Sequence, residues 1–354
     1  MMRKKIYSII CSVLLLCPGI IAAQSITDTT VVTETNEAYL QLIKLVNEQG
    51  YTKEVAAAAQ SLLKNATKSG SSQLRIAALE IVFATQADKI KMLNAALKDK
   101  DEAYRNAALR YASGYADKAM YTDLMKSLPK AMNERKVEIL YWIGNEAKSN
   151  EKREILKTVE TAIEKTGVQT LIQLLSTPDH NVKQAVASAL CNIGEKEAIP
   201  ALADLFKSDD TQVVTIAKTA LSTFEGDVPL SVAKIMRQAS DEGKKAALEL
   251  LSLRKADAYF NAVLEQTKSA SPQVRIVAYE TLKNVVSEKD FIILCGMLET
   301  AEPVYMLPLQ QAVASSISSL APEKREEMIN NRMLQAGDSK NHLYNPILTS
   351  TDCK

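Results

Sequence analysis

Apolar and polar positions along the chain alternate with the period of helices rather than that of strands. In Gly167–Phe224 the sequence reads GVQTLIQLLSTPDHNVKQAVASALCNIG and then EKEAIPALADLFKSDDTQVVTIAKTALSTF. Each half holds an apolar segment, a short polar turn and a second apolar segment, with apolar residues three or four apart. This spacing is typical of amphipathic helices. The stretch therefore predicts two copies of one helix–turn–helix unit.

The same unit recurs along most of the chain at a fixed distance. Matched positions in the second helix of each unit are separated by 30 or 31 residues, except for a step of 47 residues from Lys136 to Lys183. These positions are Arg75, Arg105, Lys136, Lys183, Val214, Lys244 and Arg275. A fixed period of this size indicates a repeat architecture. The predicted fold class is all-α, an α-solenoid of stacked antiparallel helix pairs.

The pattern also predicts where each helix lies. A first helix, Asn36–Gln49, is expected to cap the stack with Tyr39, Leu40, Leu42, Ile43 and Val46 on one face. The expected pairs are Thr52–Lys68 with Ser72–Gln86, Asp88–Lys98 with Asp101–Ser113, Asp117–Leu128 with Asn133–Asn145, Gly167–Ser176 with Asn181–Ile193, Lys196–Lys207 with Thr211–Phe224, Val228–Ala239 with Glu242–Leu253, Ala256–Lys268 with Pro272–Val286, Lys289–Glu299 with Val304–Leu320, and Pro322–Gln335 with Ser339–Thr349. An unpaired helix at Glu151–Lys165 accounts for the one long step.

Turn residues and prolines refine these bounds. Asp88, Asp117 and Ser176 stand where an N-cap or a turn needs a side-chain acceptor. Pro308 and Pro346 fall inside helical patterns, and proline in a helix interior removes one backbone hydrogen bond. We expect these two prolines to kink or shorten their helices.

The repeat unit resembles a known family. The run GEKEAIPALADLF, a Ser-Asp-Asp turn and VVTIAKTAL resemble the short HEAT-like repeat of the phycobilisome-lyase type. The resemblance implies a HEAT/armadillo-like superhelix that binds other molecules, and no particular chemistry, because fold does not dictate function. In that family the matched basic residue pairs with a turn acid six residues earlier. Asp99 and Arg105 fit this rule, whereas Thr177 and Ser269 stand in the acid's place before Lys183 and Arg275.

The N-terminal segment has the layout of a secretory signal peptide. A basic Met1–Lys5 precedes the apolar run Ile6–Leu16, and Ile21-Ala22-Ala23 precedes Gln24. A membrane anchor is the alternative, but the apolar run is barely long enough to span a bilayer and is broken by Pro-Gly. The predicted organisation is a signal peptide (1–23), an extended polar linker (24–35), a HEAT-like solenoid (36–349) and a tail (350–354). The mature chain would then be periplasmic or extracellular.

Charge and cysteine content narrow the classes of function. The formal net charge is +1, and removing the leader with its three basic residues leaves 40 basic against 42 acidic residues, a net charge of −2. Nucleic-acid binding usually needs a basic stripe, so no nucleic-acid partner is expected. Cys191 and Cys295 sit in apolar helical runs and Cys353 in the tail, which does not make a disulfide framework. We expect inert buried thiols.

Candidate chemistry is sparse. The chain has no CxxC, HExxH, GxSxG, GxGxxG or P-loop motif, and its two histidines, His180 and His342, lie far apart in sequence. We therefore expect no enzyme activity, no cofactor and no metal site. The recurring basic residues are interpreted as a structural ladder, with an anion-binding groove as the alternative.

Aromatic residues gather in one region and supply the candidate binding surface. Six of them fall within the 39 residues from Tyr104 to Trp142. Tyrosine and tryptophan combine an apolar face with a polar tip, which suits interfaces. Tyr141 and Trp142 are adjacent, so both cannot point into a helical core and one is expected to reach the surface. The candidate residues are Tyr111, Tyr115, Tyr121, Tyr141 and Trp142, and core filling is the alternative for all of them.

These observations predict an exported binding or scaffold module whose partner is another protein or a glycan. No stable membrane anchor is expected after cleavage of the leader. The main alternative is the N-terminal solenoid of a larger secreted glycan-processing, sugar hydrolase-like protein, because Asn341–Lys354 lacks the polar face of a terminal capping repeat. A docking adaptor for an envelope complex is a third possibility, which differs only in its partner.

Overall fold

The computed structural model describes residues 29–50, 52–85, 88–162 and 165–349, and it divides into two compact units, Met1–Tyr115 and Ala116–Lys354. The predicted signal peptide (1–23) and tail (350–354) lie outside the described residues. The first unit contains the helices α2 (Thr29–Gln49), α3 (Lys53–Ser69), α4 (Ser72–Thr85), α5 (Lys89–Ala96) and α6 (Glu102–Ala112).

The second unit contains the remaining helices and one short ribbon. Its elements are α7 (Lys118–Ser127), α8 (Asn133–Glu146), α9 (Asn150–Lys157), β1 (Glu160–Ala162), β2 (Lys165–Thr166), α10 (Gly167–Leu174), α11 (His180–Ile193), α12 (Ala198–Asp204), α13 (Thr211–Thr223), α14 (Val228–Ile235), α15 (Asp241–Leu253), α16 (Phe260–Gln266), α17 (Pro272–Leu282), α18 (Phe291–Leu298), α19 (Pro303–Ser316), α20 (Pro322–Ala336) and α21 (Asn341–Thr349). Short 3-10 turns lie beside several of them, at Leu128–Lys130, Leu205–Lys207, Met236–Gln238, Asp257–Tyr259, Glu288–Asp290 and Asp338–Lys340.

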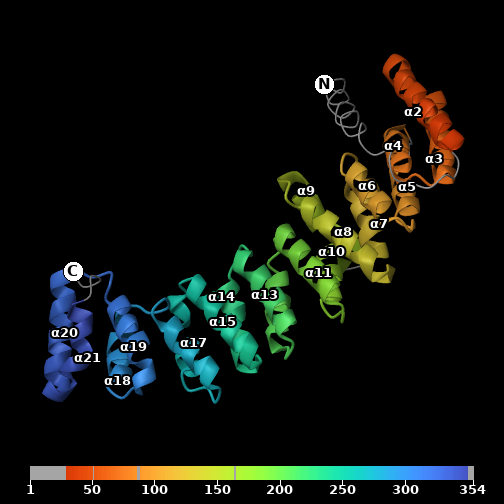
Figure 1. Cartoon of the computed structure of the whole chain (residues 1–354). Coiled ribbons are helices and arrows are strands. Elements are labelled where there is room, and N and C mark those ends of the chain that lie inside the picture. The colour runs from red at the N-terminus through yellow and green to blue at the C-terminus, as the bar shows by residue number, and fades with distance from the viewer. Residues whose placement is uncertain (1–28, 51, 86–87, 163–164, 350–354) are drawn as a thin grey trace. The chain divides into compact units, whose positions relative to one another are not determined.

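Helix pairs stack in sequence order within the second unit (Figure 1). Each second helix packs on its own first helix and on the second helices before and after it, in the row α8, α11, α13, α15, α17, α19 and α21. Fully burying an aliphatic side chain contributes about 1.5–3 kcal/mol, and no pair can bury its apolar face alone. The predicted all-α solenoid is confirmed.

The predicted repeat register is confirmed at the level of single residues. The matched positions from Arg75 to Arg275 are each the fourth residue of a second helix, in α4, α6, α8, α11, α13, α15 and α17. Asp88 and Asp117 are N-caps, as expected, and accept from the backbone N–H groups of Lys91 and Met120.

The basic ladder is structural, and its ties run to the main chain. Arg105 Nη1 donates to the carbonyl of Asp99 at 2.9 Å, and Arg275 Nη1 donates to the carbonyl of Ser269 at 2.8 Å. Lys183 Nζ reaches the carbonyl of Leu175 at 2.5 Å. A main-chain acceptor is available at any residue, so the missing acids at Thr177 and Ser269 do not break the tie. Arg105 and Lys183 are buried, which argues against the anion-binding alternative at these positions.

The N-terminal helix differs from the prediction in two ways. α2 begins at Thr29, so the segment from Thr29 to Thr35 is helical and not an extended linker. Threonine costs only a fraction of a kcal/mol in a helix, and this segment has no glycine or proline to stop propagation. Leu42 is buried while Leu40 is exposed, since 100° per residue places Leu40 away from the face that packs on α3.

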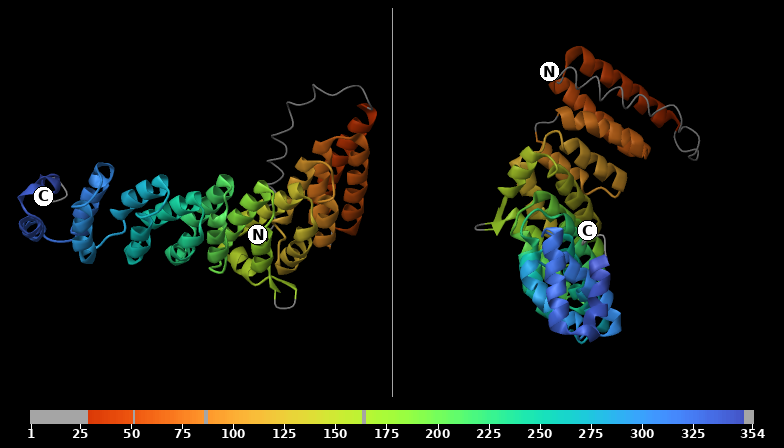
Figure 2. Two further views of the ribbon diagram at one scale, coloured as in Figure 1. Left: turned by 90° about the horizontal axis from the view of Figure 1, so that it is seen from below. Right: turned by 90° about the vertical axis from the view of Figure 1, so that its left-hand side faces the viewer.

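The insertion before α10 is also different from the predicted single helix. α9 ends at Lys157, and β1 pairs with β2 in an antiparallel ribbon. The ribbon, yellow-green in Figure 2, lies at the edge of the stack. Val159 and Thr161 alternate with polar residues, which is a strand period rather than a helix period. α9 is not unpaired, because it packs on α7, α10 and α11.

Two smaller predictions need correction. Ser176 is not an N-cap, since its hydroxyl donates back to the carbonyl of Gln173 while Asp179 caps α11. Pro308 and Pro346 do not shorten their helices, which run on to Ser316 and Thr349. Each proline removes a single backbone hydrogen bond near the start of its helix, and packing of the apolar face outweighs that loss.

Candidate functional site

A groove of 380 Å³ opens along three second helices of the second unit. It is lined by Glu249 and Ser252 of α15, by Val277, Glu280 and Asn284 of α17, and by Leu307 and Gln311 of α19. The three helices are neighbours in the row of second helices. We call this feature the second-helix groove.

The helical period determines which side chains reach this groove. On α17, Val274, Ala278 and Leu282 are four residues apart and buried in the stack. Val277 and Glu280 lie on the opposite side of the same helix and line the groove. The core of α17 is therefore complete without the groove residues, which are free to serve another purpose.

Large aliphatic side chains are exposed on these groove helices. Leu307 and Val304 of α19 retain 62% and 61% of their accessible surface, and Ile276 of α17 retains 42%. Leu307 itself lines the groove, Ile276 adjoins Val277, and Val304 lies one turn before Leu307 on the same face of α19. Single exposed leucines are ordinary on protein surfaces, but a set of aliphatic residues beside a groove indicates an interaction site.

Polar contacts hold the groove helices in register. Lys218 of α13 forms an ion pair with Glu249. Asn284 Nδ2 donates to Ser252 Oγ at 2.7 Å, and Lys283 Nζ donates to Gln311 Oε1 at 3.1 Å. Each of these contacts joins residues about one repeat apart, so the walls of the groove are cross-linked between successive units.

Glu280 is the exception among the charged residues of the groove. Its carboxylate is exposed, and in the described part of the chain it has no hydrogen bond or ion pair. Lys283 lies three residues further along α17 but its ammonium is directed to Gln311 on α19. The groove thus presents one carboxylate without a partner beside an aliphatic surface.

The predicted aromatic surface divides between the two units. In the first unit Tyr104 is buried, with the Arg75 guanidinium 4.2 Å from its ring centroid. Tyr111 is half-buried under Arg110, and burial, together with the charge of Glu80, raises its pKa. Tyr115 is exposed, and Lys89 Nζ lies 4.5 Å from its ring centroid.

In the second unit Trp142 is buried and Tyr141 is exposed, as expected for one of the two. Tyr121 was expected at the surface but is fully buried. Its ring centroid is 5.6 Å from that of Trp142, and its hydroxyl donates to Glu146 Oε2 at 2.9 Å. Lys152 of α9 also reaches Glu146 Oε2, at 2.5 Å. Tyr121 and Trp142 therefore belong to the core, because a buried hydroxyl needs the partner that Glu146 supplies.

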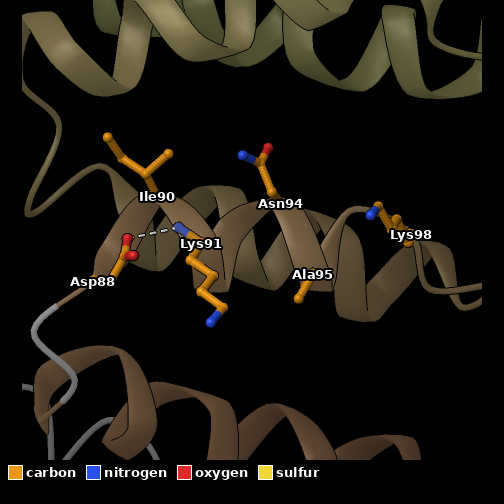
Figure 3. Close-up of a pocket in the computed structure, with 6 residues that line it drawn as sticks. All are labelled: Asp88, Ile90, Lys91, Asn94, Ala95 and Lys98. Atoms are coloured by element: carbon orange, nitrogen blue, oxygen red, sulfur yellow. Dashed lines mark hydrogen bonds between the residues drawn. The ribbon is translucent and has the colours of Figure 1, made fainter.

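A second hollow, of 530 Å³, lies on α5 of the first unit and is shown in Figure 3. Its lining comes only from α5 and the residues beside it, and Asp88 accepts from the backbone N–H of Lys91 as the helix cap. In Figure 3, Ile90 and Asn94 point to one side of the helix, while Lys91 and Ala95 point to the other. Diverging side chains cannot enclose a ligand, so we do not treat this hollow as a site.

Other polar clusters are structural. Glu299 of α18 is largely buried and is held by Arg332 Nη2 at 2.7 Å, by Lys340 Nζ at 3.4 Å and by the Tyr344 hydroxyl at 2.6 Å. Burial also raises the pKa of the Cys295 thiol to about 11, which fits the inert thiol expected there. Cys191 is only partly buried, with its Sγ 3.3 Å from the Thr223 hydroxyl.

The described residues offer no metal centre and no bilayer-spanning segment. No group of three or more His, Cys, Asp or Glu side chains is arranged to hold a metal ion in the part of the chain that the structure covers. Within the same residues, none of the helices combines the length and the apolar character that crossing a bilayer needs.

Comparison with known families supports the repeat assignment. Residues 137–222, from α8 to α13, match a family model described as HEAT repeats. This range includes most of Gly167–Phe224, where the resemblance in sequence is sharpest. The chain is built from HEAT-like helical repeats. No curated protein matches it.

Several solved repeat proteins are similar in outline. An engineered protein is 18% identical, with a TM-score of 0.40 over 89% of this chain and 95% of its own. The Escherichia coli protein YibA is 13% identical, with a TM-score of 0.38 over 82% and 99%. A designed armadillo repeat protein in complex with the peptide (KR)4 is 17% identical, with a TM-score of 0.26 over 73% and 100%. At these TM-scores the likeness carries no further argument.

Sequence reasoning missed the second-helix groove. A signal was present, because QVRIVAYETL has more aliphatic residues than one core face requires. After Val274, Ala278 and Leu282 are assigned to the core, Ile276 and Val277 remain for the opposite side. The pattern could have revealed exposed aliphatic residues, but not that α15, α17 and α19 bring theirs to one groove.

Proposed function

We propose that the chain is an exported scaffold that captures a segment of another protein in the second-helix groove, without catalysis of its own. The HEAT-like stack supplies the framework. The observation that carries the proposal is the exposed aliphatic surface of Leu307, Val304 and Ile276 beside a groove with cross-linked walls. Burying such a side chain in a complex contributes about 1.5–3 kcal/mol, so a bound segment would be held mainly by these residues.

A peptide array tests this proposal with the intact chain. Immobilised synthetic heptapeptides of defined sequence are probed with purified protein, and we expect a subset to retain it. Leu307→Ser should abolish this retention, because it removes the aliphatic contact. The matched control is Leu334→Ser on the first helix α20, where the leucine is 83% exposed and far in sequence from the groove. Equal binding by both variants, or no retention of the wild type, would overturn the proposal.

Export is part of the proposal and rests on the leader sequence. The basic Met1–Lys5, the apolar run Ile6–Leu16 and the small residues before Gln24 support cleavage after Ala23. N-terminal sequencing of the product recovered outside the cytoplasm should begin at or near Gln24. Recovery of the intact leader on the cytosolic protein would contradict it.

A glycan partner remains a second proposal, supported by the exposed ring of Tyr141, which offers an apolar face for stacking on a sugar. Tyr115 is exposed in the other unit and is considered separately. The alternative of a larger glycan-processing protein is tested by the intact mass of the native product. A glycan array probed with wild type and Tyr141→Ala distinguishes the two partner classes, since only a glycan partner predicts a loss of binding there.

A further inference from the structure

We propose that the second-helix groove selects an extended segment in which a lysine or arginine lies two residues from a large aliphatic side chain. This inference rests on the proposed function and names the partner's chemistry. The aliphatic side chain packs against Val277 and Leu307, and the cation pairs with the carboxylate of Glu280. The argument depends on the charges, the spacing and the size of the groove.

The charges favour a basic partner. Glu249 already pairs with Lys218, and Lys283 is directed to the amide of Gln311. Glu280 is left as the one groove carboxylate without a partner in the part of the chain that the structure describes. Bonds between a carboxylate and an ammonium or guanidinium group are shorter and stronger than neutral ones. An acidic segment would meet both Glu249 and Glu280, so it is disfavoured.

The spacing brings the carboxylate and the aliphatic surface within reach of one segment. Val277 and Glu280 are three residues apart on α17 and both line the groove. Residues at this helical spacing have Cβ atoms about 5–6 Å apart. In an extended chain, side chains two residues apart point to the same side and are separated by about 6.6 Å. An aliphatic-x-basic pattern therefore matches the positions of Val277 and Glu280.

The size of the groove favours an extended segment over a helix. Its 380 Å³ lies near the lower end of the range of about 300–1,000 Å³ that is typical of ligand pockets. This volume admits a few side chains, whereas a helix would need a longer apolar channel for several successive turns. The polar end of the groove, at Ser252 and Asn284, has its hydrogen bonds satisfied across the helices and does not compete for the cation.

The test compares matched peptides with matched protein variants. The probes are fluorescein-labelled heptapeptides that share one array-selected sequence and carry Leu-x-Lys, Leu-x-Gln, Leu-x-Glu or Ser-x-Lys at the central positions. Fluorescence anisotropy with the full chain should give the tightest binding for Leu-x-Lys and about tenfold weaker binding for Leu-x-Gln, as expected for loss of one charged hydrogen bond. Glu280→Gln should remove this preference, and Glu280→Lys should shift it toward Leu-x-Glu.

Glu326→Gln is the matched control, because Glu326 is also exposed on a helix and has no partner among the described residues. It should leave the preference for lysine unchanged. Leu307-dependent binding without a preference for lysine, or a preference that survives Glu280→Gln, would overturn this inference while leaving the proposed function intact. If no peptide binds in a Leu307-dependent manner, both fail.

Discussion

His180 Nε2 lies 2.7 Å from Asp210 Oδ2, and this contact joins the first residue of α11 to the N-cap of α13. The same relationship recurs where Asn133 of α8 donates to Asp179 Oδ2 at 3.0 Å, and where Ser72 of α4 donates to Asp101 Oδ2. In each case the other carboxylate oxygen accepts the backbone N–H groups of its own helix. One aspartate therefore caps its helix and ties it to the preceding repeat.

Asp210→Ala should destabilise the second unit at neutral pH, because it removes both the cap and the contact with His180. The hydrogen bond from His180, followed by the bonds from backbone N–H groups, lowers the pKa of Asp210. A lowered folded-state pKa gives stability above the unfolded-state value that is lost as pH falls through the folded-state value. The difference between wild type and variant in urea unfolding should therefore shrink below about pH 4. A difference independent of pH would contradict this account.

Trp142→Ala should be far more destabilising than Tyr141→Ala. Trp142 is 7% exposed and packs on Tyr121, whereas Tyr141 is 43% exposed. Truncating a buried aromatic residue costs about 3–5 kcal/mol, while surface substitutions usually stay within about 0.5 kcal/mol. Chemical denaturation followed by circular dichroism measures both. Similar losses for the two variants would show that Tyr141 is part of the core.

Glu299→Ala should loosen the last helix pair, α20 and α21. Burial acts to raise the pKa of Glu299, but the hydrogen bonds from Tyr344 and Arg332 and the charge of Arg332 outweigh it, so the net shift is downward. Removing one partner of a buried ion pair costs about 3–5 kcal/mol. Hydrogen exchange should report loss of protection in α20 and α21.

The control for this prediction is Glu288→Ala. Glu288 also forms an ion pair between neighbouring segments, with Lys324 at 3.6 Å, but both side chains are about half exposed. Exposed pairs contribute about 0–1 kcal/mol. If Glu288→Ala loosens α20 as much as Glu299→Ala does, the buried network is not what holds the pair.

Gly243→Ala and Gly296→Ala should change stability in opposite directions. A Cβ on Gly243 of α15 would lie 1.9 Å from the carbonyl oxygen of Phe206, which belongs to the main chain and cannot move aside cheaply. We expect a loss of at least about 1–3 kcal/mol, as for overpacked cores. A Cβ on Gly296 of α18 would meet nothing within 4 Å, so alanine should gain about 0.5–1 kcal/mol. Thermal unfolding of both variants is the measurement.

Helix pairs and their register were accessible to sequence reasoning because they depend on local periods. The polar turn between Leu175 and Val182 and the aspartate caps can be recognised within a few residues, and the structure places them as expected. The ribbon at Glu160–Thr166 was missed because two short strands were interpreted inside a longer helical pattern. The burial of Tyr121 was missed because its partners, Trp142 and Glu146, lie more than 20 residues further along the chain.

The sequence by itself determined the solenoid, since every apolar stripe follows a helical period and recurs at a fixed interval. Only the tertiary structure decided which exposed residues share a surface. Ser252, Val277, Glu280 and Leu307 come from three repeats, and no local pattern relates the outward faces of separate helices. Stacking places α15, α17 and α19 side by side, and that contact turns scattered aliphatic residues and one unpartnered carboxylate into a groove.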